Sequence, residues 1–318
     1  MSDSATSSSL AFVFPGQGSQ AVGMLAELAA VHPQVRAAFT EASTGAGIDL
    51  WRLSQEGPET ELNRTEFTQP ALLAAGIGVW RAWLAAGGTR PVLLAGHSLG
   101  EYTALVAAGV LSLHDAAGLV RERGRLMQEA VPVGVGAMAA VLGADDELIA
   151  EICEQVAGAE VVAPANFNSP GQTVIAGHAA AVDRALAKLA QSGVRKAVKL
   201  PVSVPSHTAL MHGAAERLAA RMATIGWSAP SIPVVHNADV RSHDDPAAIR
   251  DALTRQLHQP VQWTGCVQEL RDRGATRVIE CGPGKVLAGL IKRIDRSLDA
   301  RAIGTPADFD TALKDFHA

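Results

Sequence analysis

The stretch PVLLAGHSLG, residues 91–100, passes directly from a continuous apolar run into a turn of the pattern Gly-x-Ser-x-Gly. The run from Pro91 to Gly96 is typical of a strand buried on both faces, and the segment from Glu101 to Ala108 has the composition of a helix. At a sharp strand-to-helix turn the central serine, Ser98, is exposed above free N–H groups of the helix N-terminus. We therefore expect Ser98 to be a nucleophile. The alternative is a tight turn whose serine only caps the helix.

The same alternation of apolar strands and helices continues on both sides of this stretch. Further strands are expected at residues 10–14, 232–235 and 277–280. Helices are expected within residues 22–42 and 69–86, from about residue 246, and after Pro283, where the last one lies. Uniformly apolar strands separated by helices predict a parallel sheet that is covered on both faces.

The middle of the chain has a different order of elements. Strands are expected at 135–142, 161–167, 173–176 and 196–202, with helices at 145–156 and 178–192. This β-α-β-β-α-β order is the ferredoxin-like unit. We predict an α/β protein with a hydrolase-like parallel sheet core, built from residues 10–133 and 202–318. A small ferredoxin-like subdomain is inserted at 134–201, and the serine-rich residues 1–9 form a disordered tail.

Composition excludes several classes of protein. The 318 residues are 48% hydrophobic and 19% charged, with a net charge of −5 and no dense basic stripe, so a packed core is expected and nucleic-acid binding is not. The three cysteines are far apart and suggest neither a disulfide framework nor a zinc site. No signal peptide or membrane span is recognisable. We expect a soluble, cytoplasmic protein.

A serine nucleophile requires a base. Among ten histidines, His207 is the preferred candidate because it follows an apolar strand in a proline-punctuated segment. His97 adjoins the nucleophile, and because adjacent side chains diverge at such a turn we expect it to line the pocket or pack beside it. Three further histidines stay open as candidates: His212, His236 and His258.

The acid of a catalytic triad is missing. In a hydrolase with this serine motif, an acid lies between the serine and the histidine in chain order. The aspartates of that interval all look like helix-start or exposed helical positions: Asp115, Asp145, Asp146 and Asp183. We expect a backbone carbonyl or an amide to orient the imidazole instead.

Two glycine-rich loops fail the nucleotide-binding patterns that they suggest. FPGQGSQ (14–20) is followed by Ala21 where a dinucleotide fingerprint needs its third glycine, and GPGK (282–285) departs from the P-loop. A loop such as 14–20 after a parallel strand can instead bring a backbone N–H close to a reacting carbonyl. No ligand spacing suggests a metal.

Arg123 lies between Arg121 and Arg125 in a helical segment. Three arginines at this spacing usually mark a solvated helix face, but alternate positions of a helix point in different directions. An inward-pointing Arg123 beside the serine would demand an anionic group on the substrate, because a buried guanidinium needs a partner.

Taken together, these motifs resemble the malonyl-CoA:acyl carrier protein transacylases, the stand-alone acyltransferases of bacterial-type fatty acid synthesis. The resemblance extends from about residue 10 to 295, in order and spacing. It rests on the segments 14–20, 96–102, 123–124, 166–172, 205–207 and 282–284.

The resemblance implies a role for each matching residue of the reaction centre. Ser98 would be the acylated nucleophile, His207 its base, and Gln256 the residue that orients His207 through a main-chain carbonyl. The backbone N–H groups of Gln17 and Leu99 would form the oxyanion hole.

Further residues would bind the substrate. Arg123 would hold the malonyl carboxylate through two parallel hydrogen bonds. Asn166 and Asn168 would contact the pantetheine arm, and Ser206 is what malonyl-preferring members carry before the histidine.

The implied reaction transfers the malonyl group from malonyl-CoA to the phosphopantetheine thiol of acyl carrier protein, through a malonyl-serine intermediate and by ping-pong kinetics. It needs no metal or redox cofactor, and we expect a monomer. Two alternatives belong to other classes: a serine esterase or thioesterase, with water as acceptor, and a non-catalytic docking protein. A third stays within the class: a trans-acting acyltransferase that serves a polyketide synthase.

Overall fold

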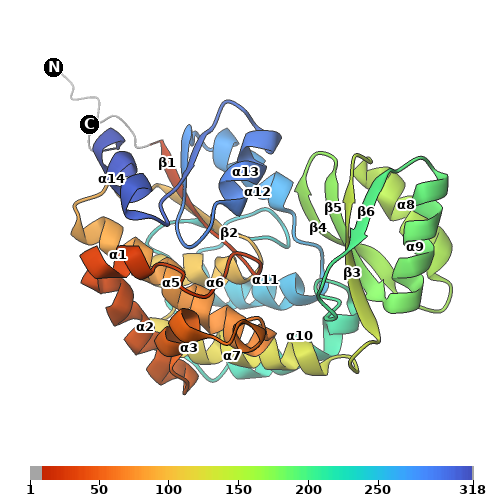
Figure 1. The fold of residues 1–318 in the computed structure, drawn as a ribbon, viewed down its shortest axis with the longest axis horizontal. Helices are drawn as coiled ribbons and strands as arrows, with labels where there is room; N and C mark the ends of the chain where they lie inside the picture. The colour runs from red at the N-terminus through yellow and green to blue at the C-terminus, as the bar shows by residue number, and fades with distance from the viewer. Residues whose placement is uncertain (1–8, 317–318) are drawn as a thin grey trace.

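The computed structural model describes residues 9–316, so the predicted tail lies outside the described residues except for Ser9. A five-stranded sheet in the order β7-β2-β1-β8-β9 forms the centre of the larger part, and every neighbouring pair in it is parallel (Figure 1). Its strands are β1 (Leu10–Phe14), β2 (Leu93–Gly96), β7 (Val234–Val235), β8 (Arg277–Glu280) and β9 (Asp299–Ala302). The predicted parallel sheet of an α/β protein is confirmed.

Helices cover both faces of this sheet, and the central strand β1 shows how. Phe12 and Phe14 belong to one buried cluster, together with residues of α2 (Pro33–Ala46), α5 (Thr65–Ala85), α6 (Leu99–Ala107) and α7 (Leu113–Glu129). Ala11 and Val13 belong to a second cluster, with residues of α12 (Trp263–Asp272) and α13 (Val286–Ile294). Because both faces of β1 are buried against apolar residues, its sequence is a continuous hydrophobic run.

Further helices surround this core. They are α1 (Ala26–Val31), α3 (Leu50–Glu56), α4 (Glu59–Leu62), the 3-10 turn η1 (Ala209–Met211), α10 (His212–Met222), α11 (Pro246–His258) and α14 (Pro306–Asp315). Among the helices within residues 9–316, none combines the length and the apolar character that crossing a membrane requires.

A second, antiparallel sheet lies beside the larger part (Figure 1, green). Its order is β4-β5-β3-β6, from β3 (Gly136–Leu142), β4 (Val162–Ser169), β5 (Gln172–His178) and β6 (Lys196–Lys199). One face packs on α8 (Asp146–Ala157) and α9 (Ala179–Gln191), through residues such as Ala139 and Val141. Met138 and Val174 point to the other face, which belongs to a small separate cluster.

The end of the chain differs from the sequence expectation. The helix after Pro283 is α13, but it is not the last, since β9 and α14 follow it. β9 is an edge strand of the parallel sheet and alternates Asp299 and Arg301 with alanines, so it lacks the apolar run that marks β1 and β2. The strands expected at 196–202 and 232–235 are also shorter, and β6 ends at Lys199 before Pro201.

The turn after β2 touches the end of β1 at the level of the backbone. A Cβ at Gly100 would lie 2.0 Å from the carbonyl oxygen of Phe14, and one at Gly16 would lie 2.6 Å from that of His97. Since backbone atoms cannot move aside as a flexible side chain does, these positions require glycine. The contact brings loop 14–20 against the serine turn.

We therefore predict that Gly100→Ala lowers the free energy of unfolding by about 2 kcal/mol or more, as overpacking against backbone does. Urea denaturation measures the change. The matched control is Gly289→Ala in α13, where an added Cβ meets nothing within 4 Å. That variant should gain up to about 1 kcal/mol, because alanine is the better helix former. Equal stability of the two variants would contradict the close approach.

Candidate active site

Ser98 sits at a strained turn between β2 and α6. Its φ is 50°, in the left-handed region, as is that of His207 at 62°. Non-glycine residues in this region cost of order 1–3 kcal/mol and persist only where the surroundings impose them. At Ser98 this backbone conformation is held by Asn237, which lies just after β7. The Asn237 Oδ1 accepts from Ser98 N–H at 2.8 Å, and its Nδ2 donates to the Gly96 carbonyl at 2.8 Å.

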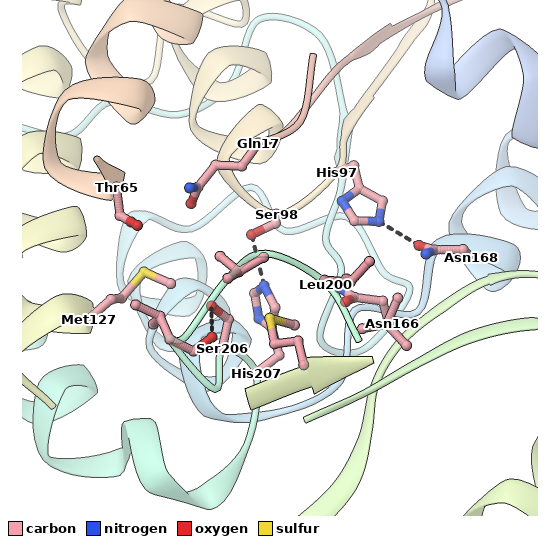
Figure 2. Close-up of a pocket in the computed structure, with 14 residues that line it drawn as sticks. Gln17, Thr65, His97, Ser98, Met127, Asn166, Asn168, Leu200, Ser206 and His207 are labelled. Atoms are coloured by element: carbon pink, nitrogen blue, oxygen red, sulfur yellow. Dashed lines mark hydrogen bonds between the residues drawn. The ribbon is translucent and has the colours of Figure 1, made fainter. Parts of the chain in front are cut away.

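His207 meets the serine directly. Its Nε2 lies 2.8 Å from Ser98 Oγ (Figure 2), and its Nδ1 lies 2.7 Å from the main-chain oxygen of Gln256. A carbonyl oxygen can only accept, so the ring proton is on Nδ1 and the lone pair of Nε2 faces the serine hydroxyl. The main-chain carbonyl of Gln256 thus occupies the place of a triad acid.

The environment keeps the His207 imidazole uncharged. Burial lowers its pKa from the ordinary 6.5 to about 3, and the nearby charge of Arg123 adds to this effect, while the Gln256 carbonyl opposes it. In the free protein His207 is therefore a free base, ready to accept the proton of Ser98.

Arg123 is fully buried on α7, whereas its neighbours Arg121 and Arg125 reach the surface. Its Nη2 donates to Ser98 Oγ at 3.2 Å and to Gln256 Oε1 at 2.9 Å, and its Nη1 donates to Gln69 Oε1 at 2.9 Å. Its buried Nε has no hydrogen-bond partner among the described residues. Within residues 9–316 the ion pairs include no carboxylate on this guanidinium. Burial lowers its pKa, and the Tyr102 and Glu101 side chains nearby oppose this effect only in part.

A pocket of about 230 Å³ opens over Ser98 and His207. Its polar lining comes from the loop after β1, through Gln17, and from the strand β4, through Asn166 and Asn168 (Figure 2). Its apolar lining includes side chains from the face of the antiparallel sheet opposite α8 and α9: Met138, Val174 and Leu200. The pocket therefore extends from the nucleophile along the second sheet.

The other candidates lie as follows. His97 lines the pocket, and its Nε2 lies 2.8 Å from Asn168 Oδ1. Burial lowers the pKa of this imidazole. Leu99 is the first residue of α6, directly after the serine. His212 and His258 contact each other, with ring centroids 5.0 Å apart and ring planes tilted by 48°. Of the histidines left open, only His236 approaches the centre, from behind Ser98, and the base candidate that meets the serine is His207.

Three residues that interpretation of the sequence gave no role complete the centre: Gln69, Glu101 and Asn237. His236, one of the histidines left open as a base, contacts Glu101 instead of the serine. Glu101 carried a usable signal, since it is the only charged residue of the otherwise apolar α6. Asn237 follows a strand at the carboxyl edge of the sheet, where functional side chains gather. Gln69 offers no local signal, because it is one polar residue in a long, mostly apolar helix.

The buried arginine, the imidazole and the strained serine on a parallel α/β sheet define a serine-dependent acyltransferase. The model of the acyl transferase domain family matches residues 11–306. The chain belongs to this family and, within it, to the malonyl CoA-acyl carrier protein transacylases.

Relatives of known name and structure resemble nearly the whole chain. The malonyl CoA-acyl carrier protein transacylase of Salmonella typhimurium is 57% identical over 95% of this chain and 98% of its own. The solved malonyl-CoA:acyl carrier protein transacylase of Xanthomonas oryzae pv. oryzae is 69% identical, with a TM-score of 0.97 over 98% and 99% of the two chains. A malonyl-transacylase solved in complex with a type II PKS acyl-carrier protein is 52% identical, with a TM-score of 0.95 over 97% and 100%.

The low pKa of His207 predicts the pH dependence of acylation. Lowering the pH from about 7.5 to about 5.5 should leave kcat/KM for acylation of the serine nearly unchanged, because an imidazole with a pKa near 3 stays neutral throughout this range. An imidazole with the ordinary pKa would lose about tenfold in its basic form by pH 5.5. Rapid-quench acylation across this range provides the measurement. A limb centred near pH 6.5 would contradict the buried, Arg123-shielded environment.

Proposed function

We propose that this chain transfers a malonyl group from malonyl-CoA to the phosphopantetheine thiol of an acyl carrier protein, through an ester on Ser98. The observation that carries the proposal is the buried Arg123, which contacts Ser98 Oγ at 3.2 Å and, within the described part of the chain, forms no ion pair with a carboxylate. A cation held in this way next to a nucleophile favours an acyl group that brings its own negative charge. The names of the relatives point to the same substrate.

The first half-reaction acylates the enzyme. His207 Nε2 takes the proton of Ser98 Oγ as the oxygen attacks the thioester carbonyl, and the backbone N–H groups of Gln17 and Leu99 stabilise the resulting oxyanion. Collapse of this intermediate breaks the C–S bond, and His207 gives its proton to the coenzyme A thiolate. A malonyl-serine ester remains.

The second half-reaction runs the same steps in the other direction. The carrier's thiol loses its proton to His207 and attacks the ester carbonyl; Ser98 leaves and recovers the proton. Asn166 and Asn168 hold the pantetheine arm, which both donor and acceptor share. The exchange of one thioester for another needs no metal or redox cofactor.

Substrate binding also prepares the base. The charge of Arg123 helps to hold down the pKa of His207, after the larger effect of burial. A malonyl carboxylate on Arg123 offsets that charge, so the imidazole becomes more basic when the correct acyl group is in place. An acetyl group brings no such compensation.

The proposal also covers the division of the chain into two parts, the compartment and the oligomeric state. We infer that residues 134–201 act as a subdomain that lines one side of the pocket, against a body of residues 10–133 and 202–318. Cys153, Cys266 and Cys281 are buried and unpaired, which favours a reducing, cytoplasmic compartment. Across the described part of the chain no three His, Cys, Asp or Glu side chains are grouped to hold a metal ion. The protein works as a monomer.

Two acceptors are chemically possible for the malonyl group: a fatty acid carrier and a polyketide carrier. The second has an observation in its favour, since one structural neighbour is a complex with a type II PKS acyl-carrier protein. Competition between the two carriers, both charged with phosphopantetheine, identifies the preferred one by the ratio of malonylated products.

Arg123→Ala should reduce the preference for malonyl-CoA over acetyl-CoA by roughly 10- to 150-fold, the value of a charge-assisted bidentate contact of about 1.5–3 kcal/mol. The ratio of kcat/KM for acylation by the two thioesters is the readout. Arg125→Ala is the matched control, because Arg125 lies on the same helix but pairs with Glu122 and Glu129 at the surface. Equal losses on both thioesters in Arg123→Ala would count against the clamp.

Transfer and hydrolysis differ in what happens without a carrier. With malonyl-CoA alone, we predict that coenzyme A is released in a burst of about one equivalent per enzyme and then stops, because water is a poor acceptor in this site. A thiol-reactive dye follows the release. Continued turnover at the rate of the burst would make the protein a thioesterase.

A further inference from the structure

Glu101 is a fully buried acid behind the nucleophile that the mechanism above does not use. Its Oε1 lies 2.7 Å from His236 Nδ1, and its Oε2 accepts from Asn237 N–H and from Gln256 Nε2, each at 2.9 Å. Both carboxylate oxygens of Glu101 are thus taken up by partners behind the serine turn, and Glu101 is not among the residues that line the pocket. Burying a carboxylate costs free energy unless it is paired and hydrogen-bonded, so these contacts are what allow Glu101 to lie here.

The contact with Gln256 has a consequence for Arg123. Gln256 Nε2 donates both to Glu101 and, at 2.9 Å, to the Ser98 carbonyl, while its Oε1 accepts from Arg123 Nη2. If the amide were reversed, its NH₂ would face the guanidinium, donor against donor, and its oxygen would face two acceptors. Glu101 therefore supplies part of the reason that the amide oxygen points at Arg123.

Glu101 and Arg123 also place opposite charges on the two sides of the Gln256 amide. The hydrogen bonds of Arg123 within residues 9–316 go to neutral oxygens, those of Gln69, Ser98 and Gln256, and its guanidinium lies 5.3 Å from the centre of the Tyr102 ring. Glu101 is a carboxylate one amide group away, on the far side of Gln256. An acceptor that is ionised makes a hydrogen bond roughly twice as strong as a neutral one, and bonds in such a chain polarise one another.

We propose that Glu101 is a positioning residue for substrate selection: through Gln256 it holds the Arg123 guanidinium beside Ser98, where the substrate carboxylate binds. The proposal rests on the proposed function, since it concerns the preference for a malonyl group. A merely structural role is the competing explanation, because Glu101 also holds Asn237 and through it the serine turn. The structural role predicts equal losses on every acyl group.

The test compares Glu101→Gln with the wild type in acylation by malonyl-CoA and acetyl-CoA. Glutamine has the same shape but lacks the charge, so the ratio of kcat/KM for the two thioesters should fall by roughly three- to tenfold, as expected when a charged acceptor becomes neutral. Glu280→Gln is the matched control. Glu280 is an equally buried acid that accepts from Ala288 N–H at the start of α13, and its replacement should leave the ratio unchanged.

A double variant separates positioning from general damage. In the Arg123→Ala background, Glu101→Gln should cause no further loss of preference, because the group that it positions is gone. Gln256→Met provides a second route should Glu101→Gln fail to fold: it removes the amide but keeps the main-chain carbonyl that holds His207. Its malonyl-to-acetyl ratio should fall at least as far as that of Glu101→Gln.

The outcomes are distinguishable. A wild-type enzyme without preference for malonyl-CoA would overturn the proposed function, and this inference with it. A preferring wild type whose ratio is unchanged in Glu101→Gln, or in Gln256→Met if the former does not fold, would overturn only this inference. So would a Glu101→Gln substitution that lowers the ratio equally with and without Arg123.

Discussion

A guanidinium buried without a carboxylate partner is the constraint on which the rest of the site depends. Arg123 donates to Gln69, Gln256 and Ser98, and its Nε has no hydrogen-bond partner among the residues that the structure describes. This arrangement is unfavourable for the protein alone, because burying a cation costs free energy that neutral acceptors offset only in part. It becomes favourable when an anionic acyl group enters and pairs with the guanidinium. The buried charge of Arg123 therefore both costs free energy in the free protein and selects for an anionic substrate. The same charge helps to keep His207 neutral until the substrate arrives.

The fold delivers this site by bringing distant backbones into contact. Gly100 lies against the carbonyl of Phe14, Asn237 holds both sides of the serine turn, and Gln256 reaches Ser98 from α11. One residue, Gln256, orients the imidazole with its main chain and the guanidinium with its side chain. A change at α11 therefore affects both the base and the substrate clamp, whereas the glycine contacts affect folding first.

Sequence patterns predict those features of the structure that depend on residues close together in the chain. The inner strands β1 and β2 are apolar runs because both of their faces are covered, and β8 has apolar residues, Val278 and Ile279, at its centre. The parallel sheet is predicted from these three strands, whereas the edge strand β9 has no such pattern and is missed. Ser98 is recognisable from its strand and turn, and the resemblance to a family implies the Gln256 carbonyl. The side-chain bonds of Gln256 and Asn237 join residues more than 130 positions apart in the chain, so no short motif reveals them. Glu101 stands inside the motif, but its partners exist only in the folded protein.

The central claim is that Ser98 carries the acyl group between two thiols. The direct measurement is mass spectrometry of peptides from enzyme incubated with malonyl-CoA, before and after addition of a phosphopantetheinylated carrier. We predict one malonyl ester, on the peptide that contains Ser98, which disappears as malonyl-carrier forms and never arises in Ser98→Ala. Malonyl-carrier made by Ser98→Ala at the wild-type rate, or an ester on a different residue that discharges to the carrier, would contradict this claim.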